Sequence, residues 1–166
     1  IHCIDLIQYI TGAKAVRVSG MTDTLAFGYE VEDAATLLLR LDNGAVASVD
    51  AYFCIPDAAA RGRLEIYGTR GSALCEGTIG QVESGTADVL LGDDTLGYDA
   101  KQDRVDVTPV KLLSDFGNMY TSQIEAFGRS ILEGAPVAVP LADALRAQRI
   151  VEACYESAKT RGTVDL

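Results

Sequence analysis

Two residues near the start of the chain have the types and the spacing for acid/base chemistry. His2, the only histidine in 166 residues, precedes Asp5 in the stretch IHCIDLIQYITG. If residues 1–12 form a helix with about 100° per residue, the two side chains lie one turn apart on its polar face, together with Tyr9. A histidine beside a carboxylate can be held charged or poised for proton transfer near neutral pH, as general acid/base catalysis requires. The same spacing also fits an ordinary polar helix face, and the residues alone leave both interpretations open.

Other chemistries have weaker support in the sequence. A nucleophilic triad would have to use His2 as its base, and no G-x-S-x-G motif accompanies it. No G-x-G-x-x-G or G-x-x-x-x-G-K-[ST] motif occurs, so the chain has no phosphate-binding loop of its own. We expect no metal site, because the cysteines are scattered and form no C-x-x-C pair. We predict instead that they are buried as small apolar side chains: Cys3, Cys54, Cys75 and Cys154.

The composition is typical of a single soluble globular domain. Hydrophobic residues make up 48% of the chain and charged residues 23%, which excludes intrinsic disorder and fibrous proteins. The net charge of −10 repels nucleic acid and anionic membrane surfaces, and no cluster of Lys or Arg offsets it. No apolar run approaches the ~18 residues of a membrane span, and residues 1–12 lack the basic leader of a signal peptide. We therefore predict a cytoplasmic protein without nucleic-acid or membrane partners.

Periodicity predicts one helix, a strand-rich middle and two final helices. The first helix covers residues 1–12 and ends at Gly12, which can take the left-handed conformation of a C′ residue. No Ser, Thr, Asp or Asn precedes its first apolar residue, so we expect the helix to begin upstream and the chain to be a fragment. Alternation in residues 14–22 then predicts a strand with Val16 and Val18 on one face. The apolar arc of the helix consists of Cys3, Ile4, Leu6, Ile7 and Ile10.

Residues 32–53 predict a hairpin whose loop length decides its register. A two-residue loop at Asn43-Gly44 would place leucines of the first strand opposite polar residues. A three-residue loop with Asp42 added and Gly44 left-handed pairs them with apolar residues, so we predict this loop. The predicted pairs are Leu41 with Ala45, Leu39 with Ala47, and Leu37 with Val49. The opposite face has a mixed character that suggests a contact face, with Thr36, Leu38, Arg40, Val46, Ser48, Asp50 and Tyr52.

The rest of the chain predicts a second hairpin, weaker strands and the two final helices. The hairpin spans residues 63–77 with Thr69-Arg70-Gly71 at its turn. Weaker strands are expected near 79–83, 87–91 and 104–110, with a solvated loop at 91–104 that contains Asp93 and Asp94. Helix 118–134 has the apolar stripe Ile124, Phe127, Ile131 and Leu132. Helix 140–162 begins at Pro140, ends at Gly162, and has the stripe Leu141, Ala144, Leu145, Val151, Cys154 and Ala158.

The order of these segments resembles the C-terminal half of the Gfo/Idh/MocA oxidoreductases. The resemblance spans nearly the whole chain and rests on IHCIDLIQYITG, EDAATLLLRLDNGAVASVDA, LEIYGTRGSA and YTSQIEAFGRSILEG. The final stretch, VPLADALRAQRIVEACYESAKTRGTVDL, is its most specific part. It implies an α+β fold with a large, mostly antiparallel, open-faced sheet and helices packed on one face, of the GAPDH-like C-terminal domain type. Residues 1–166 would then be a single substrate-binding and oligomerisation domain, without the N-terminal Rossmann domain.

The resemblance also implies a function and roles for site residues. The family motif D-x-x-x-H-x-x-D maps onto His2 as catalytic acid/base and onto Asp5 as the carboxylate one turn on. The first aspartate of the motif and the lysine of the family's E-K-P segment would lie upstream of Ile1. The parent would be a dehydrogenase that uses NAD or NADP on a sugar, cyclitol or related polyol. It would form a homodimer or tetramer through the open sheet face, while this chain alone would bind no cofactor.

Tyr120, at the start of helix 118–134, is a candidate to add a hydroxyl to the substrate pocket, and an aromatic side chain that only packs at the helix start is the alternative interpretation. An alternative from a different class is a non-catalytic small-molecule-binding or dimerisation module of the same fold. An upstream Rossmann fingerprint, an E-K-P segment and an aspartate three residues before Ile1 would distinguish the enzyme from this module.

Overall fold

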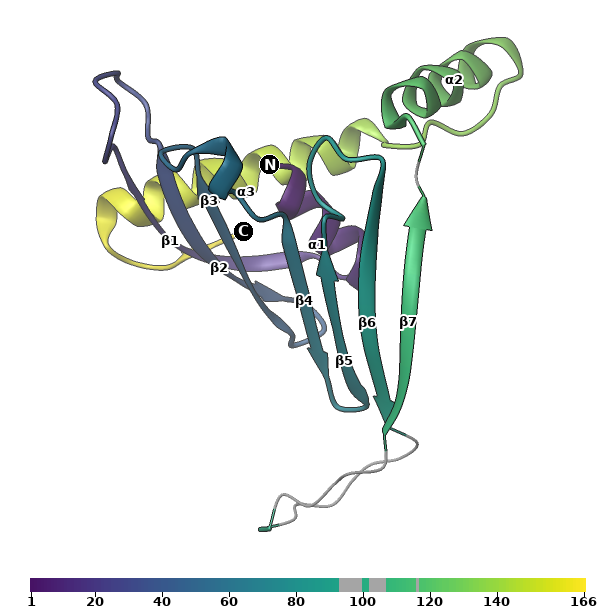
Figure 1. Ribbon diagram of the computed structural model, residues 1–166. Coiled ribbons are helices and arrows are strands. Elements are labelled where there is room, and N and C mark those ends of the chain that lie inside the picture. Colours follow the sequence, from purple (N-terminus) through teal and green to yellow (C-terminus); the bar gives the residue numbers. More distant parts are fainter. Residues whose placement is uncertain (93–99, 102–106, 116) are drawn as a thin grey trace. The chain divides into compact units, whose positions relative to one another are not determined.

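The computed structural model describes residues 1–92, 100–101, 107–115 and 117–166. These residues fall into two compact units, Ile1–Ala59 with Val137–Leu166, and Ala60–Pro136. Within the described part of the chain, the strands form two four-stranded antiparallel sheets, one in each unit (Figure 1). The predicted α+β class and the mostly antiparallel pairing are confirmed. That residues 1–166 make one domain stays a prediction.

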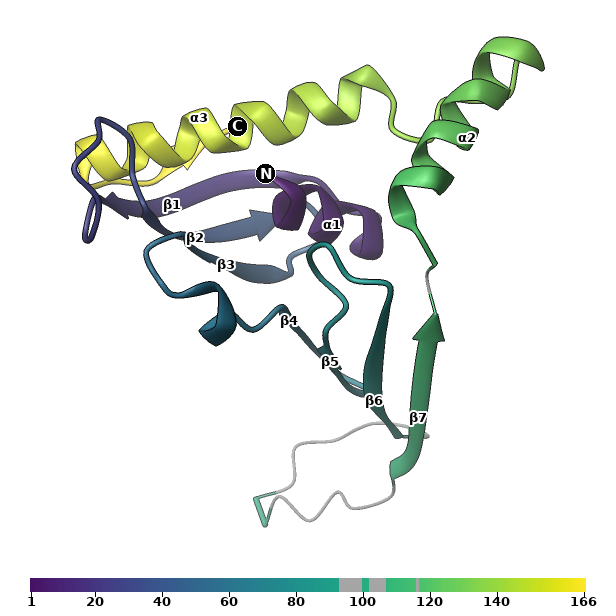
Figure 2. The same ribbon diagram turned by 45° about the horizontal axis from the view of Figure 1, so that its top comes forward.

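The first unit packs two helices on one face of a sheet with the strand order β3-β2-β1-β8. Its elements are α1 (His2–Thr11), β1 (Ala15–Asp23), β2 (Ala34–Leu41), β3 (Val46–Tyr52), the 3-10 turn η1 (Asp57–Ala59), α3 (Leu141–Thr160) and β8 (Val164–Asp165). Figure 2 shows α3 lying along β1. The core between the sheet and α3 includes three side chains that are at most 1% exposed, Val18, Leu39 and Ile150. Ile4 of α1 belongs to the same core.

The predicted first hairpin is confirmed in its loop and its register. Gly44 has φ 88°, and its N–H donates to the Leu41 carbonyl, as in a three-residue loop with a G1 bulge. The Leu41 N–H donates to the Ala45 carbonyl. Leu39 pairs with Ala47 and Leu37 with Val49, as predicted. The apolar residues thus share the face that meets the helices.

In β1 the predicted alternation is wrong at one position. The register with β2 shifts between Ala15 and Arg17, so a bulge occurs at Val16. Ala15 and Val18 are buried, whereas Val16 is 38% exposed. The extra residue changes which side chains face the core, and simple period-2 alternation cannot foresee it.

The predicted apolar stripe of α3 is wrong in its first half, whereas Val151, Cys154 and Ala158 of its second half are buried or half-buried. Cys154 is buried as predicted, but Leu141 is 84% and Leu145 48% exposed. The buried residues of the helix are small, except for Ile150 near its middle: Ala147, Ile150, Ala153, Cys154 and Ser157. Small side chains let α3 approach β1 closely, since a Cβ on Gly20 would lie 2.4 Å from the Cys154 sulfur. The sequence predicts that the helix ends at Gly162; its C-cap is instead Arg161, which has the left-handed conformation (φ 58°).

The second unit contains a sheet with the order β4-β5-β6-β7. Its elements are β4 (Arg63–Gly68), β5 (Gly71–Glu76), β6 (Ser84–Gly92), β7 (Val107–Asp115) and α2 (Met119–Leu132). The hairpin predicted at 63–77 is confirmed, although Gly71 pairs with Gly68 and the loop is therefore only Thr69-Arg70.

Two further predictions in the second unit differ from the structure. Residues 79–83 form bends rather than a strand, and Gly77 and Gly80 have positive φ values of 64° and 107°, which a strand does not allow. The strand predicted at 104–110 is β7, which begins at Val107; residues 104–106 lie outside the described residues. The loop predicted at 91–104, with Asp93 and Asp94, lies mostly outside them as well.

Helix α2 is confirmed, but its apolar stripe is exposed. The Asn118 side chain accepts a hydrogen bond from the Thr121 N–H and caps the first turn. No residue of α2 is buried, although the structure describes all of them. Ile124 is 72% exposed and Phe127 61%. The helix is therefore amphipathic as predicted, without burial of the apolar side.

A buried serine joins α3 to the edge of the first sheet. The Ser157 hydroxyl, in a residue that is 1% exposed, accepts from the Gly20 N–H at 2.9 Å and donates to the Gly162 carbonyl. In a continued ladder between β1 and β8, the Gly20 N–H would meet the Gly162 carbonyl directly. The hydroxyl therefore takes the place of one ladder bond where β8 ends.

Replacing this serine with alanine should destabilise the fold. In Ser157→Ala, the Gly20 N–H and the Gly162 carbonyl lose their common partner, so we expect the free energy of unfolding to fall by about 1–3 kcal/mol. Urea unfolding followed by circular dichroism measures the change. Thr160→Ala, which removes an exposed hydroxyl bonded to the Glu156 carbonyl on the same helix, should change stability by no more than about 0.5 kcal/mol. Equal effects of the two variants would contradict the bridging role.

A buried carboxylate organises the loop between β1 and β2. Asp33 is 2% exposed, and its carboxylate accepts from the N–H groups of Leu25 (2.7 Å), Ala26 (2.8 Å) and Phe27 (3.0 Å). Its carbonyl accepts from Phe53 N–H at 2.8 Å. Burial raises the pKa of Asp33, but the backbone N–H donors lower it by more, and the net pKa lies below the usual value. The sequence shows no pattern that separates this aspartate from its solvated neighbours.

The depressed pKa predicts a pH-dependent contribution of Asp33 to stability. A group whose pKa is lower in the folded state stabilises the fold above its unfolded pKa, and this stabilisation is lost as the pH falls through the folded pKa. Asp33→Asn should therefore unfold at lower urea than wild type at pH 7. The difference should shrink as the pH falls below about 4, the ordinary carboxyl range. A difference that stays constant from pH 7 to pH 2.5 would show that the charge plays no part.

Candidate functional site

The predicted acid/base pair lies on α1. The apolar side of this helix packs against the sheet. Ile4 is 3% exposed, and Cys3 and Ile7 pack against the same core. This packing turns His2 outward, where it is exposed, while Asp5 one turn on is half-buried. The structure therefore places both side chains on one helix at the predicted spacing, and the imidazole is accessible to a substrate.

Asp5 lines a cleft between the second half of α1 and the start of α3, which we call the α1–α3 cleft. Its volume is about 290 Å³. Helix α1 contributes Asp5, Gln8 and Tyr9, and Lys14 follows in the link to β1. The wall on the α3 side is formed by the segment 138–140 with Asp143 and Arg146.

Some polar side chains of the α1–α3 cleft have hydrogen-bond partners within the protein, and others do not. The Gln8 amide oxygen accepts from the Ala15 N–H at 3.2 Å, and Arg146 donates to Asp143 at 3.0 Å. Within the described ranges, no ion pair or side-chain hydrogen bond involves the Asp5 carboxylate or the Lys14 ammonium. The cleft therefore offers a free acceptor and a free donor to a ligand.

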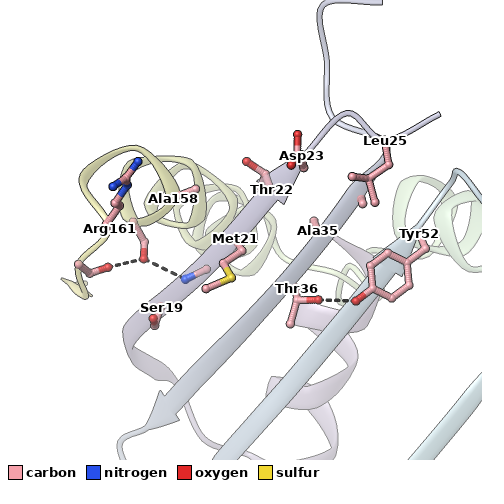
Figure 3. A pocket seen from close by; sticks show the side chains of 14 residues that line it. Ser19, Met21, Thr22, Asp23, Leu25, Ala35, Thr36, Tyr52, Ala158 and Arg161 are labelled. Carbon is pink, nitrogen blue, oxygen red and sulfur yellow. Dashed lines mark hydrogen bonds between the residues drawn. The ribbon is translucent and has the colours of Figure 1, made fainter. Parts of the chain in front are cut away.

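The first unit has a larger, open cavity at the other end of β1, which we call the β1-edge cavity. It has a volume of about 590 Å³ and lies where β1 ends beside the last turn of α3 (Figure 3). Met21 lies near its centre, with Arg161 on one side and Tyr52 on the other. Neither His2 nor Asp5 lines it. This cavity is therefore separate from the predicted acid/base pair.

Tyr120, the third predicted site residue, belongs to the second unit. It lies in the first turn of α2, next to the capping residue Asn118, and is 49% exposed. The hydroxyl is thus available to a ligand, and its part in a substrate pocket stays a prediction.

Three residues of the α1–α3 cleft were missed by the sequence analysis. Gln8 follows Asp5 by three positions, so the same helical-face argument that linked His2 to Asp5 would have found it. Lys14 and Arg146 are far apart in the sequence and meet only through the fold. No local pattern marks them.

The described residues contain no group of three His, Cys, Asp or Glu side chains that could hold a metal ion. Among the cysteines, Cys154 is buried and the others are half-buried. Burial, with the nearby Glu32 charge, raises the pKa of the Cys154 thiol. None of the helices in the described ranges has the length and apolar character needed to cross a bilayer.

Comparison with solved structures establishes the fold. Over 99% of this chain, the aldose-aldose oxidoreductase from Caulobacter crescentus complexed with glycerol is 22% identical, with a TM-score of 0.78. Levoglucosan dehydrogenase in complex with NADH and levoglucosan is 23% identical over the same share, with a TM-score of 0.76. An oxidoreductase from Agrobacterium radiobacter in complex with NAD+, L-tartaric acid and magnesium is 21% identical over 99% of this chain, with a TM-score of 0.74.

The chain spans less than half of each of these proteins: 45%, 48% and 46% of their lengths, in the same order. A search of curated proteins found no match. Among protein families, residues 1–166 match the oxidoreductase family, C-terminal alpha/beta domain, of the Gfo/Idh/MocA type. Because this match covers the whole chain, the protein belongs to the Gfo/Idh/MocA oxidoreductase family and corresponds to its C-terminal domain.

Proposed function

We propose that this chain is the substrate-side domain of an NAD(P)-dependent dehydrogenase that acts on a sugar, cyclitol or related polyol. The observation that carries the proposal is the exposed His2 on α1, one turn from the half-buried Asp5, in a chain of this oxidoreductase family. The solved relatives named above include complexes with NADH or NAD+ and with levoglucosan or glycerol. They support a nicotinamide cofactor and a polyol substrate in the parent protein.

The chain's own residues do not fit a dinucleotide. The sequence has no G-x-G-x-x-G turn, the motif that binds the pyrophosphate in a dinucleotide-binding domain. Residues in another part of the parent protein would therefore hold the nicotinamide cofactor, which would supply the hydride-accepting group.

The part proposed for this chain is proton transfer and substrate orientation. An imidazole nitrogen of His2 takes the proton from the substrate hydroxyl as the carbinol becomes a carbonyl. Asp5 binds substrate hydroxyls and balances the charge of the imidazolium. For Tyr120, which belongs to the second unit, a substrate contact stays a prediction.

The open face of the first sheet is proposed as an oligomer interface. Leu38, Val46 and Tyr52 are 51%, 60% and 45% exposed, more apolar surface than a solvated strand usually presents. A homodimer, or a tetramer of such dimers, would cover this face. A non-catalytic binding or dimerisation module would use the same face without needing His2, so loss of activity on changing His2 distinguishes the two functions.

Cofactor titration tests how the function is divided along the protein. The isolated chain should fold and show no specific heat of binding with NADH or NADPH in calorimetry, because it lacks the phosphate-binding turn. The full-length parent should bind one of them and reduce NAD+ or NADP+ with a polyol. A micromolar dissociation constant for the isolated chain would contradict this division, and a parent without polyol oxidation would contradict the proposed function.

A further inference from the structure

We propose that the α1–α3 cleft binds a second sugar ring, so that the substrate of the parent enzyme is a disaccharide or other glycoside rather than a free monosaccharide. This inference rests on the proposed function, because it takes His2 to mark the reacting carbon. It assigns a binding role to Gln8 and Lys14 and extends the role of Asp5.

The first argument is the direction of the cleft from His2. On a helix with about 100° per residue, Asp5, Gln8 and Tyr9 lie within about 120° of His2 on one side of α1. Tyr9 lies seven positions after His2, a rise of about 10 Å along the helix. A single sugar ring with its reacting carbon at His2 does not reach across that length, whereas two linked rings do.

The second argument is the match of free polar groups to hydroxyls. The Asp5 carboxylate accepts, while the Lys14 ammonium donates, and neither is occupied within the described part of the chain. The Gln8 amide oxygen is held by the Ala15 N–H, which leaves its NH₂ group as a donor. A sugar hydroxyl both donates and accepts, so adjacent hydroxyls can satisfy such a mixed set.

The third argument is that the charges favour a neutral ligand. Arg146 is paired with Asp143 at 3.0 Å, and Asp5 opposes Lys14 with one charge each. The formal charges of the cleft therefore cancel, so an anionic group such as a phosphate gains little. The Tyr9 side chain, 82% exposed, adds an aromatic surface at the rim.

The size of the cleft fits one ring. Its volume of about 290 Å³ lies at the lower end of the range for small-molecule sites, which begins near 300 Å³. This volume can hold one sugar ring, and the proposal places the other ring near His2.

Kinetics of the full-length parent test the proposal. Maltose, cellobiose and lactose are compared with glucose and galactose, and at least one disaccharide should have a kcat/KM at least tenfold above that of its monosaccharides. Lys14→Met and Gln8→Leu should raise KM for that disaccharide about tenfold or more, with kcat and monosaccharide kinetics nearly unchanged. Lys159→Met, an exposed lysine on α3 outside the cleft, is the matched control and should match wild type.

Binding is measured separately from turnover, so that the two proposals can fail separately. Saturation-transfer NMR on the His2→Ala parent should show disaccharide signals that weaken in the added Lys14→Met variant. Turnover without disaccharide preference, or equal effects of Lys14→Met on both sugar classes, would overturn the cleft proposal and keep the dehydrogenase. Lys14-dependent binding of a disaccharide without any turnover would overturn the dehydrogenase and keep the cleft. Absence of disaccharide binding would overturn the cleft proposal outright.

Discussion

His2→Ala should lower the turnover of the full-length enzyme by about 10²- to 10⁴-fold, the usual effect of removing a general acid/base. Stability should be unchanged, because the side chain is exposed. Steady-state kinetics with the preferred polyol and thermal unfolding of the same preparations measure both quantities. KM should change much less than kcat, since the proton is transferred during the chemical step.

The matched control is Thr11→Ala, which changes an exposed residue at the other end of α1 and should keep full activity. If His2→Ala kept activity but unfolded at lower temperature, His2 would be a structural residue. If it kept both, the chain would have the properties of the binding module rather than the enzyme.

Tyr52→Asp should dissociate the proposed dimer. Thr36, Asp50 and Tyr52 form a hydrogen-bonded cluster on the open face, with Tyr52 Oη 2.6 Å from Thr36 Oγ1 and 3.3 Å from the Asp50 carboxylate. A second carboxylate there would place like charges together at an interface, once on each subunit, and such juxtaposition costs several kcal/mol. A loss of about 2.8 kcal/mol already weakens the dimer about 100-fold.

Light scattering at tens of micromolar measures the oligomeric state. Tyr52→Phe keeps the ring and loses only the hydroxyl, so it should remain a dimer like wild type. A wild-type protein that is monomeric throughout, or a dimer that Tyr52→Asp leaves intact, would show that the open face of the first sheet is not the interface.

Local chemistry made some parts of the fold predictable. The Asp42-Asn43-Gly44 loop was predictable because only one register pairs leucines with apolar partners, and a glycine stands where the left-handed residue is needed. Gly12 marked the end of α1 for the same reason (φ 63°). In both places the backbone needs a left-handed residue, and the sequence has a glycine there.

Other parts depend on contacts that are distant in the sequence. The positions of the leucines predicted which side of α3 is buried. The helix instead meets β1 through small residues opposite Gly20. No pattern in the neighbouring sequence indicates this close approach. The bulge at Val16 follows from pairing with β2. The site shows the same division, because α1 alone gives His2 and Asp5, while Lys14 and Arg146 come together only when α3 folds beside α1.

The Ser157 hydroxyl has a consequence for alignment within the first unit. One oxygen holds the rotation of α3 about its axis and the position of the final residues against β1 at the same time. A one-residue slip of Val164 along β1 would turn its side chain to the other surface and would also separate Gly162 from the hydroxyl. Helix α3 and strand β8 therefore cannot shift independently of each other. The hydroxyl permits only one register between β8 and β1.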